Sequence, residues 1–446
     1  MEWWHKLKRR WEVVLFVVSF FFLSLVLAFG TGFYVADRHK FPYFHIRIAT
    51  LAAVCNYGLE ISTRLFEKKH KKYPFVWAVT REKTTGTVVY EPAATYDGYT
   101  LIADNDTSAR LIDMQGTVVH QWRKPFSEVW PRPEHVRPLI EPVPEALIYW
   151  QRVFLFPNGD LLAIYAGPFA PYGAGLVKLN ARSELLWKAD INAHHDLAVA
   201  DDGRIYVLTH QYAYDQGRPR TDDDITILSS DGRVLEKISV FRAIKDSPYY
   251  NLISDAPYGD YLHTNNLELL TPDKAAGFPF LNPGDILLSH REAIGVTIID
   301  ARTARVKWAL TGVATSIHDA DFGPDGGIVF FENKAYKQGS QILEWDCRRH
   351  QPRWRFTPAD YFYGFGSPPA EDAFSSPIGG RQQRLPNGNY LVVETCGGSL
   401  FEVTPEKKVV WKYVSTNFDG ESIGLLYDAE RYSPTDLTFL SERGDG

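Results

Sequence analysis

The sequence predicts an all-β protein, a six-bladed β-propeller preceded by an N-terminal transmembrane helix. Composition is one reason, because 27 Phe, 24 Tyr and 12 Trp favour strands while 33 Gly and 27 Pro supply turns. A second reason is a turn signal between short apolar runs that recurs at Asp97–Gly98, Pro157–Gly159, Asp202–Gly203, Pro283–Gly284, Asp325–Gly326 and Pro386–Gly388. In most units a second turn and a Trp-bearing strand follow. Such repeats indicate four-stranded sheets arranged radially around an axis.

The N-terminal segment carries the membrane signal. Residues 13–36 contain no charged side chain and are long enough to span a bilayer as a helix. Lys6, Lys8, Arg9 and Arg10 precede them, so the positive-inside rule places the N-terminus in the cytoplasm. The body of the chain is then expected in the periplasm or another extracytoplasmic space. A cleaved signal peptide is the alternative, although the apolar run is long for one and no Ala-x-Ala site is evident.

A linker is expected between the membrane helix and the propeller. Within it, residues 47–66 have the pattern of an amphipathic helix, and the basic run at 68–72 suits lipid headgroups or a solvated linker equally well. The predicted organisation is therefore a basic tail and anchor over residues 1–36, a linker over 37–85 and a catalytic propeller over 86–446.

Charge and cysteine content narrow the class of protein further. The net charge is −6 and no basic stripe runs through the body, which argues against nucleic acid as a partner. The three cysteines, Cys55, Cys347 and Cys396, are too few for a disulfide framework, and none stands in a CxxC pair. One bridge between Cys347 and Cys396 is compatible with the sequence.

The propeller units are unequal in length. Their last strands carry Trp122, Trp187, Trp308, Trp354 and Trp411, with Leu235 at this position in the third unit. The gaps between units predict insertions, of which residues 122–150 and 210–262 are the largest, and these are expected to form loops over one face. The segment after Trp411 is expected to help close the ring.

Histidines recur at one position of the repeating unit. His195 and His318 each stand eight residues before a turn glycine, and each is followed by Asp. The inner strand of a blade lines the central channel and its upstream end lies at one mouth, so both histidines are expected there. The Asp that follows each of them is equally compatible with a turn cap.

The fourth unit supplies further candidates. His263 heads its first strand, Asn265 follows on the same strand face, and Arg291 ends the next strand. Arg152 and Arg381 stand at comparable places in units two and six. Three histidines from neighbouring blades are therefore expected to meet near the axis.

Some alternatives remain open at this point. His194 could replace His195 at the axis, because adjacent strand residues face opposite sides and the register is not fixed by the sequence. His210, His290 and His350 are interpreted as ordinary surface or loop residues.

The motifs resemble those of the arylsulfotransferase family, which are bacterial, exported, six-bladed propellers that need no nucleotide sulfate donor. The resemblance spans roughly residues 90–415 and lies in His194–Asp196, Asp260–Asn265, Ser289–Arg291, His318–Ala320 and Phe331–Asn333. It implies that His318 takes up the sulfuryl group and that His195, His263, Asn265 and Arg291 hold the sulfate oxygens. The sequence departs from the family in two ways. It has no counterpart of a short-loop disulfide found in some members, and its N-terminal region is a membrane segment.

The residue types suit this chemistry in their own right. A neutral imidazole can attack sulfur and give a covalent intermediate. Arg and protonated His stabilise the charge that spreads over the oxygens, and His can act as both acid and base near neutral pH. The predicted catalytic residues are His318, His263, His195 and Arg291, and the predicted substrate-binding residues are Asn265, His194, Arg381 and Asn333.

The expected reaction moves a sulfuryl group from an aryl sulfate donor to a phenolic acceptor, without a cofactor. One alternative is a non-catalytic propeller that binds an anionic ligand or a protein partner. Another is zinc on the three imidazoles, a familiar ligand set, although the positive charge of Arg291 argues against a cation there.

Overall fold

The computed structural model describes residues 76–80, 82–139, 142–169, 172–215, 218–253, 259–314, 316–333, 339–363 and 374–441. The chain divides into two compact units, residues 1–66 with 214–219 and residues 67–213 with 220–446, and the second unit contains the sheets. The described ranges contain no helix with the length and apolar character needed to cross a membrane. The expected membrane helix at 13–36 and amphipathic helix at 47–66 lie outside these ranges.

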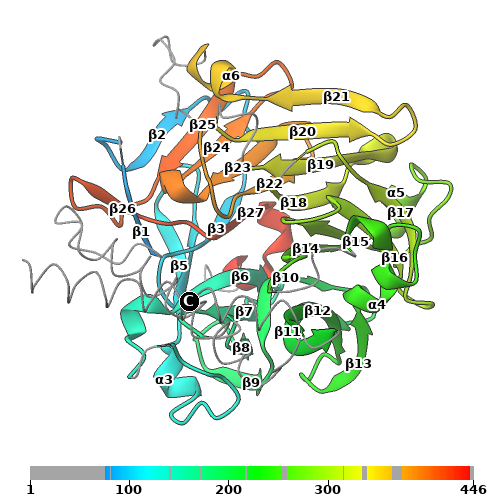
Figure 1. Ribbon diagram of the computed structural model, residues 1–446. Coiled ribbons are helices and arrows are strands. Elements are labelled where there is room, and N and C mark those ends of the chain that lie inside the picture. The colour runs from blue at the N-terminus through cyan, green and yellow to red at the C-terminus, as the bar shows by residue number, and fades with distance from the viewer. Residues whose placement is uncertain are drawn as a thin grey trace, which may run out of the picture. The chain divides into compact units, whose positions relative to one another are not determined.

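Six antiparallel sheets surround a common centre, which confirms the six-bladed propeller (Figure 1). Blade 1 consists of β27 (Asp428–Tyr432), β3 (Tyr99–Ala103), β4 (Ser108–Ile112) and β5 (Val118–Arg123). Blade 2 consists of β6 (Tyr149–Leu155), β7 (Leu161–Ala166), β8 (Gly175–Leu179) and β9 (Leu185–Ala189). Blades 3 and 4 consist of β10 (Ala193–Val199), β11 (Ile205–Asp215), β12 (Arg218–Leu228) and β13 (Val234–Ser239), and of β14 (Thr264–Leu269), β15 (Ile286–His290), β16 (Val296–Asp300) and β17 (Arg305–Leu310). Blades 5 and 6 consist of β18 (Ile317–Phe322), β19 (Gly327–Glu332), β20 (Gln341–Asp346) and β21 (Gln351–Phe356), and of β22 (Arg381–Arg384), β23 (Tyr390–Glu394), β24 (Ser399–Val403) and β25 (Val409–Val414).

Both ends of the described chain take part in closing the ring. β27, from the segment after Trp411, pairs with β3 as the innermost strand of blade 1, as the sequence predicts. β2 (Gly86–Tyr90) adds a fifth strand to the outer edge of blade 6 by pairing with β25. β1 (Trp77–Val79) pairs with β26 (Ser422–Gly424) in a separate two-stranded sheet.

The repeated tryptophans connect neighbouring blades. Each of four outer-strand indoles donates a hydrogen bond to a backbone carbonyl in the turn of the next blade. These bonds are Trp122 to Gly159 (3.0 Å), Trp187 to Ser230 (3.1 Å), Trp354 to Pro405 (2.8 Å) and Trp411 to Met114 (2.9 Å). The indole therefore serves two purposes at once, because its ring fills the space between sheets while its N–H finds a partner.

The two long insertions differ in structure. In the described part of residues 122–150, the short helices α3 (Phe126–Val129) and η1 (Glu145–Leu147) are the only helices or strands between the flanking strands. Residues 210–262 were expected to form a loop, and that expectation is wrong. They contain β12, β13, α4 (Val240–Lys245) and η2 (Tyr250–Leu252). The sequence suggested a loop because the β11–β12 hairpin is much longer than the other hairpins and its polar Asp222–Asp224 run resembles a turn.

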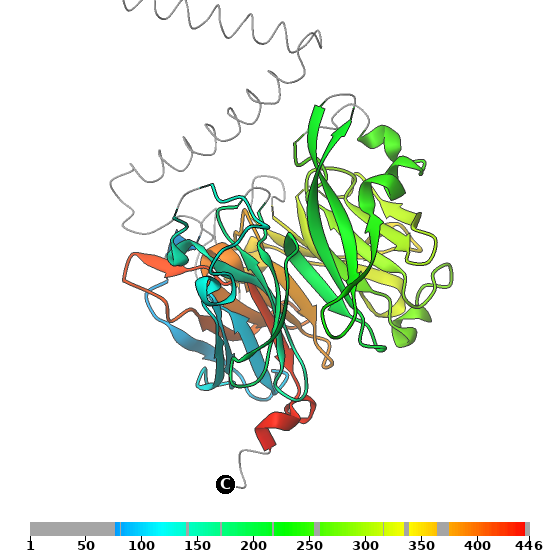
Figure 2. The same ribbon diagram turned by 90° about the horizontal axis from the view of Figure 1, so that it is seen from below.

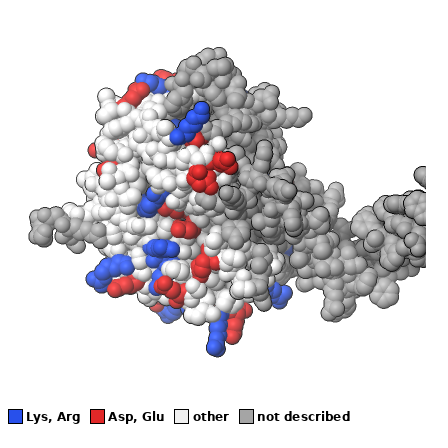
Figure 3. Space-filling view, turned by 90° about the vertical axis from the view of Figure 1, so that its left-hand side faces the viewer, with Lys and Arg blue, Asp and Glu red and all other residues white. Residues whose placement is uncertain are grey.

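The remaining helices are short and lie at the ends of strands. They are α5 (Pro272–Ala275), η3 (Pro324–Gly326), α6 (Pro358–Tyr363), η4 (Thr395–Gly397), η5 (Pro434–Asp436) and α7 (Thr438–Ser441). The Phe439 N–H of α7 donates to the Pro157 carbonyl in the β6–β7 turn, so α7 lies at the downstream ends of the inner strands (Figure 2). On the face seen in Figure 3, acidic and basic side chains are interspersed.

Cys347 and Cys396 are both free thiols, so the bridge that the sequence permits is not formed. Cys347 packs in an apolar cluster of blades 4 and 5, while Cys396 lies in η4 of blade 6, where its thiol points to the Ile378 carbonyl.

Candidate active site

A β-bulge interrupts the upstream end of the inner strand in each of blades 2 to 5. The pairing register shifts between Trp150 and Arg152, between Ala193 and Leu197, between Thr264 and Asn266, and between His318 and Ala320. A bulge inserts an unpaired residue and turns the side chains around it. The inner strands of blades 6 and 1 pair without such a shift. The bulges therefore lie in the three blades that supply His195, His263 and His318 and in blade 2, whose Gln151 contacts His195.

At or beside the bulges of blades 3, 4 and 5 the backbone is left-handed. His195 and His263 have φ angles of 54° and 51°, and Asp319 has a φ of 48°. This conformation is uncommon for a residue with a Cβ and costs about 1–3 kcal/mol at each position. The strain at His195 is held by a hydrogen bond of 2.8 Å from its N–H to Oε1 of Gln151 in blade 2.

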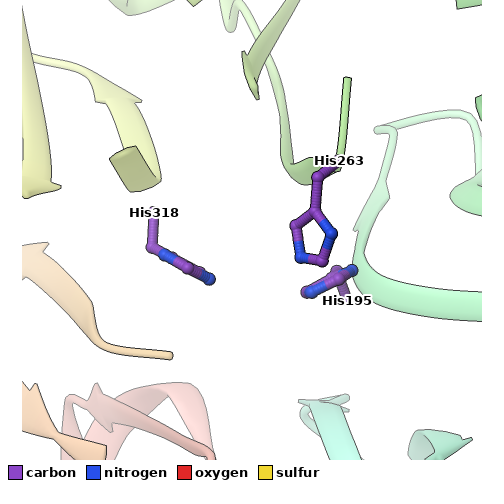
Figure 4. A group of neighbouring side chains, drawn as sticks. All are labelled: His195, His263 and His318. Carbon is purple, nitrogen blue, oxygen red and sulfur yellow. The ribbon is translucent and has the colours of Figure 1, made fainter. Parts of the chain in front are cut away.

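Three imidazoles face one another at the upstream mouth of the channel (Figure 4). Nitrogen atoms of His195, His263 and His318 all lie within 4.8 Å of one another. The ring of His195 is centred 5.0 Å from that of His263 and 6.3 Å from that of His318. In Figure 4 the His318 ring points across the open centre toward the other two.

Asn333 fixes the proton position on His318. The Asn333 amide N–H groups donate to the carbonyls of Ser376 (2.6 Å) and Gly379 (2.5 Å), which makes Oδ1 the end that faces Nδ1 of His318. Because Oδ1 can only accept, Nδ1 must carry the proton and Nε2 keeps its lone pair. Burial, the charges of His263, Arg291 and Arg381, and an opposing contribution from the Asn333 bond leave the pKa of His318 at about 3. His318 is therefore a neutral imidazole at neutral pH.

His263 has a carboxylate partner. Its Nδ1 lies 2.5 Å from Oδ2 of Asp260, three residues earlier. Burial would raise the pKa of Asp260, but the bond from His263 and the charges of His263, His210 and Arg291 leave it lowered. Asp260 is thus ionised, so it orients the His263 ring with Nδ1 as a donor.

His195 is surrounded by aromatic rings rather than by carboxylates. The Tyr172 hydroxyl lies 2.7 Å from Nδ1 of His195, and Nδ1 of His194 lies 2.8 Å from the same atom. Burial and the charges of His263, His318, His210 and Arg291 lower its pKa well below the ordinary value. Because of the bulge, His195 joins the mouth while His194 turns into blade 3, where it is fully buried.

Arg291 and Asn265 complete the site in blade 4. The Arg291 side chain is partly exposed, its ion-pair partner among the described residues is Glu292 at 3.3 Å, and its buried Nε has no hydrogen-bond partner there. Its guanidinium therefore still has a donor, Nε–H, that can bind an anion. Asn265 donates to the Ile317 carbonyl (2.9 Å) and accepts from the Ser289 hydroxyl (2.6 Å), so it holds the strand that carries His318.

Arg381 lies one layer deeper, among carboxylates. It contacts Asp196 (3.3 Å), Asp319 (3.0 Å) and Asp428 (3.1 Å). Each of these carboxylates also accepts a backbone N–H from the inner strand of another blade, at Leu267, Gln382 and Val153 respectively. The Asp after each histidine therefore ties blades together at the axis. A cavity of ≈ 720 Å³ lies beyond this layer, and none of the three histidines lines it.

Sequence reasoning missed several residues of the site. His210 and His290 are buried, which corrects their interpretation as surface or loop residues, whereas His350 is exposed. His290 bonds to the hydroxyls of Thr264 and Thr297, while His210 stacks on His194 beside Asp223. Tyr172 lies in a loop and carries no sequence signal, but Asp260 is part of the motif that contains His263.

The charge at the mouth distinguishes between ligands. The three imidazole nitrogens are close enough to hold a metal ion. The positive charge of Arg291 acts on His318, however, and it favours an anion over a cation.

Comparison with known proteins identifies the family. Residues 152–416 match the model of a family described as Arylsulfotransferase (ASST). Among solved structures, the chain is similar to a protein of unknown function from Bacteroides caccae, with 12% identity and a TM-score of 0.47 over 75% of this chain and 98% of that one. It is also similar to the WD40 β-propeller domain of Doa1, with 8% identity and a TM-score of 0.40 over 80% and 96%. Likeness at this level carries no argument about activity. No curated protein matches the chain.

The family match covers more than half of the chain and contains His195, His263, Arg291 and His318. These are the residues that gather at the propeller mouth, in the arrangement described above. The chain therefore belongs to the arylsulfotransferase family and is an arylsulfotransferase-like enzyme.

Proposed function

We propose that the enzyme moves a sulfuryl group from an aryl sulfate to a phenol through a sulfated His318. The observation that carries this proposal is the fixed tautomer of His318. Asn333 accepts from Nδ1, and the lone pair of Nε2 is therefore available for attack. Its lowered pKa keeps the ring unprotonated at neutral pH. An imidazole in this state is a ready nucleophile.

In the first half-reaction, Nε2 of His318 forms a bond to sulfur while the bond from sulfur to the aryl oxygen breaks. The departing phenolate takes the electron pair. Arg291 and His263, the latter supported by Asp260, stabilise the negative charge on the sulfuryl oxygens. Positioning and charge stabilisation supply most of the catalysis in the related phosphoryl transfers.

In the second half-reaction, the oxygen of an acceptor phenol attacks the same sulfur and the nitrogen–sulfur bond breaks. The acceptor gives its proton to a neighbouring base, and the electron pair of the broken bond returns to Nε2 of His318. No nucleotide or other cofactor takes part in either step. Donor product leaves before the acceptor reacts, so parallel initial-rate plots are expected.

Mass spectrometry tests the covalent step. The enzyme is incubated with an aryl sulfate and no acceptor, and the added SO₃ is mapped at mildly alkaline pH. The expected label is on His318, and His318→Asn should abolish it. A label on Tyr172 or another residue would contradict the assignment. Absence of any label together with intersecting rate plots would indicate direct transfer.

The location of the enzyme is part of the same proposal. Residues 13–36 would anchor the chain, with the N-terminus in the cytoplasm and the propeller in an extracytoplasmic space, because Lys6, Lys8, Arg9 and Arg10 precede the apolar run. A reporter enzyme fused to the C-terminus should then be active only after export. Activity of that reporter in the cytoplasm would overturn the topology.

A further inference from the structure

A second group of titratable side chains lies buried behind His195, on β10, β11 and β12 of blade 3. The rings of His194 and His210 stack face to face, with centroids 3.5 Å apart and planes within 4°. Oδ1 of Asp223 lies 3.0 Å from Nδ1 of His210 and 3.6 Å from Nε2 of His194. All three side chains are at most 1% exposed.

Several atoms of this group lack a hydrogen bond of ordinary geometry among the described residues, although Nδ1 of His210 and Oδ1 of Asp223 are in ion-pair contact. They are Nε2 of His194, both ring nitrogens of His210 and Oδ1 of Asp223. Unpaired buried polar atoms are costly and therefore call for an explanation. Ligand atoms of the three side chains lie within 4.8 Å of one another, but a metal ion must lie in the plane of each imidazole that binds it, and two parallel ring planes 3.5 Å apart share no such point. The parallel rings instead suit the storage of one proton.

The number of protons follows from charge. Two imidazolium rings at this separation would repel strongly, so the stacked pair carries at most one proton. A buried carboxylate requires a compensating positive charge, and one proton on the pair supplies it. Burial, and then the charges of His210 and His263, lower the pKa of His194 well below its ordinary value. His210 is the ring closer to Asp223, so its Nδ1 is the ring nitrogen at which a proton would lie next to the carboxylate.

Sulfuryl transfer by the proposed route can use such a store. The phenolate that leaves in the first half-reaction requires a proton, and the phenol that attacks in the second releases one. The overall reaction consumes no proton, so a proton that the enzyme gives to the leaving phenolate in the first step is recovered from the acceptor phenol in the second. Nδ1 of His194 lies 2.8 Å from Nδ1 of His195, which connects the buried group to the mouth.

We propose that His194, His210 and Asp223 hold this proton and exchange it with the substrates through His195. The inference rests on the proposed function. In the first half-reaction His195 gives a proton to the leaving oxygen and regains one from His194, which is refilled from His210 through Oδ1 of Asp223. The second half-reaction runs the same path backwards. The gap of 3.6 Å between Asp223 and His194 must shorten by about 0.5 Å to reach hydrogen-bond distance.

Other charged or titratable groups face this path. Tyr172 contacts the rings of His194, His195 and His210, and the Asp260–His263 pair borders His195. Asp224 neighbours Asp223 on β12, and burial raises its pKa to about 6. None of these groups replaces the connection between His194 and His195. Substitution of His210 therefore removes the proton donor at the far end of this path.

The test compares donors that differ in their need for a proton. Sulfation of the enzyme is followed by rapid quenching and intact-mass spectrometry, with 4-nitrophenyl sulfate and with phenyl sulfate. 4-Nitrophenolate leaves readily without a proton, whereas phenolate, with a conjugate-acid pKa of about 10, needs one. His210→Gln should change the rate with 4-nitrophenyl sulfate by less than about threefold and lower the rate with phenyl sulfate by about 10²-fold or more, the usual contribution of general acid catalysis.

His290→Gln is the matched control, because His290 is another buried histidine but bonds to Thr264 and Thr297. It should affect both donors in parallel. If His210→Gln also lowers both rates in parallel, its role is structural and the proposal fails. If His210→Gln does not fold, Asp223→Asn gives the same comparison. Absence of a His318 label in the wild-type enzyme with either donor would instead refute the proposed function itself.

Discussion

The pH dependence of enzyme sulfation tests whether His318 is held neutral. A histidine with the ordinary pKa of about 6.5 is about 3% neutral at pH 5. The pKa of His318 is about 3, so about 99% of the ring is neutral at that pH. Lowering the pH from 8 to 5 should therefore leave the sulfation rate nearly unchanged, whereas an ordinary histidine nucleophile would lose about 30-fold.

The assay follows the mass of the sulfated enzyme in the first turnover with 4-nitrophenyl sulfate, whose leaving group needs no proton. Asn333→Asp provides the perturbation, because an opposite charge beside His318 should raise its pKa by about 1–3 units. The variant should lose up to about tenfold in rate between pH 8 and pH 5. A loss of about 30-fold over the same range in the wild-type enzyme would refute a neutral, buried His318.

Three further predictions concern single residues. Arg291→Lys should lower kcat/KM by about 10²–10³-fold in a protein with unchanged melting temperature, because lysine lacks the planar fork, and unchanged turnover would remove Arg291 from the site. The pKa of His318 is about 3 in the folded protein and about 6.5 in the unfolded chain, so below pH 6.5 the unfolded chain binds a proton that the folded protein does not. The free energy of unfolding should therefore be lower by about 2 kcal/mol at pH 5 than above pH 6.5. The free energy of unfolding, measured with urea, should fall between pH 7 and pH 5 by about this much less in His318→Asn than in the wild-type enzyme. An equal fall in both proteins would contradict the reasoning. Asp260→Asn should lower turnover by about 10–100-fold, because His263 loses a charge-assisted bond, while the label on His318 persists; full activity would argue against that pair.

The fold could be predicted because the sequence repeats the same chemistry in each blade. Turn glycines separate the strands, and Trp122, Trp187, Trp354 and Trp411 mark outer strands because each indole bonds to the next blade. Hydrophobic pattern and turn type thus agree with one architecture. The β11–β12 hairpin escaped this reasoning, because its length breaks the repeat and its three consecutive Asp residues resemble a turn.

The candidate site could be predicted only in part. His195, His263 and His318 were recognisable from their repeated place at the heads of inner strands. Which neighbour of a pair faces the axis depends on a bulge, and a bulge of one residue leaves no mark in the hydrophobic pattern. The position of His210 and Asp223 behind His195 depends on the pairing of β11 and β12 within blade 3, which a reading of that segment as a loop excludes.

The electrostatics of the mouth can be traced to the layer beneath it. Arg152 and Arg381 are paired there with Asp196 and Asp428, at distances between 2.8 and 3.3 Å. Burial raises the pKa of Asp319 well above its ordinary value. Glu430 is a further partner of Arg152 at 3.5 Å, so the two cations face at least two anions and the layer carries no excess positive charge. The attraction for an anion at the mouth must then come from Arg291, which blade 4 supplies, while blade 5 supplies the neutral nucleophile. This division explains how His318 can stay unprotonated in a site that binds a negatively charged donor.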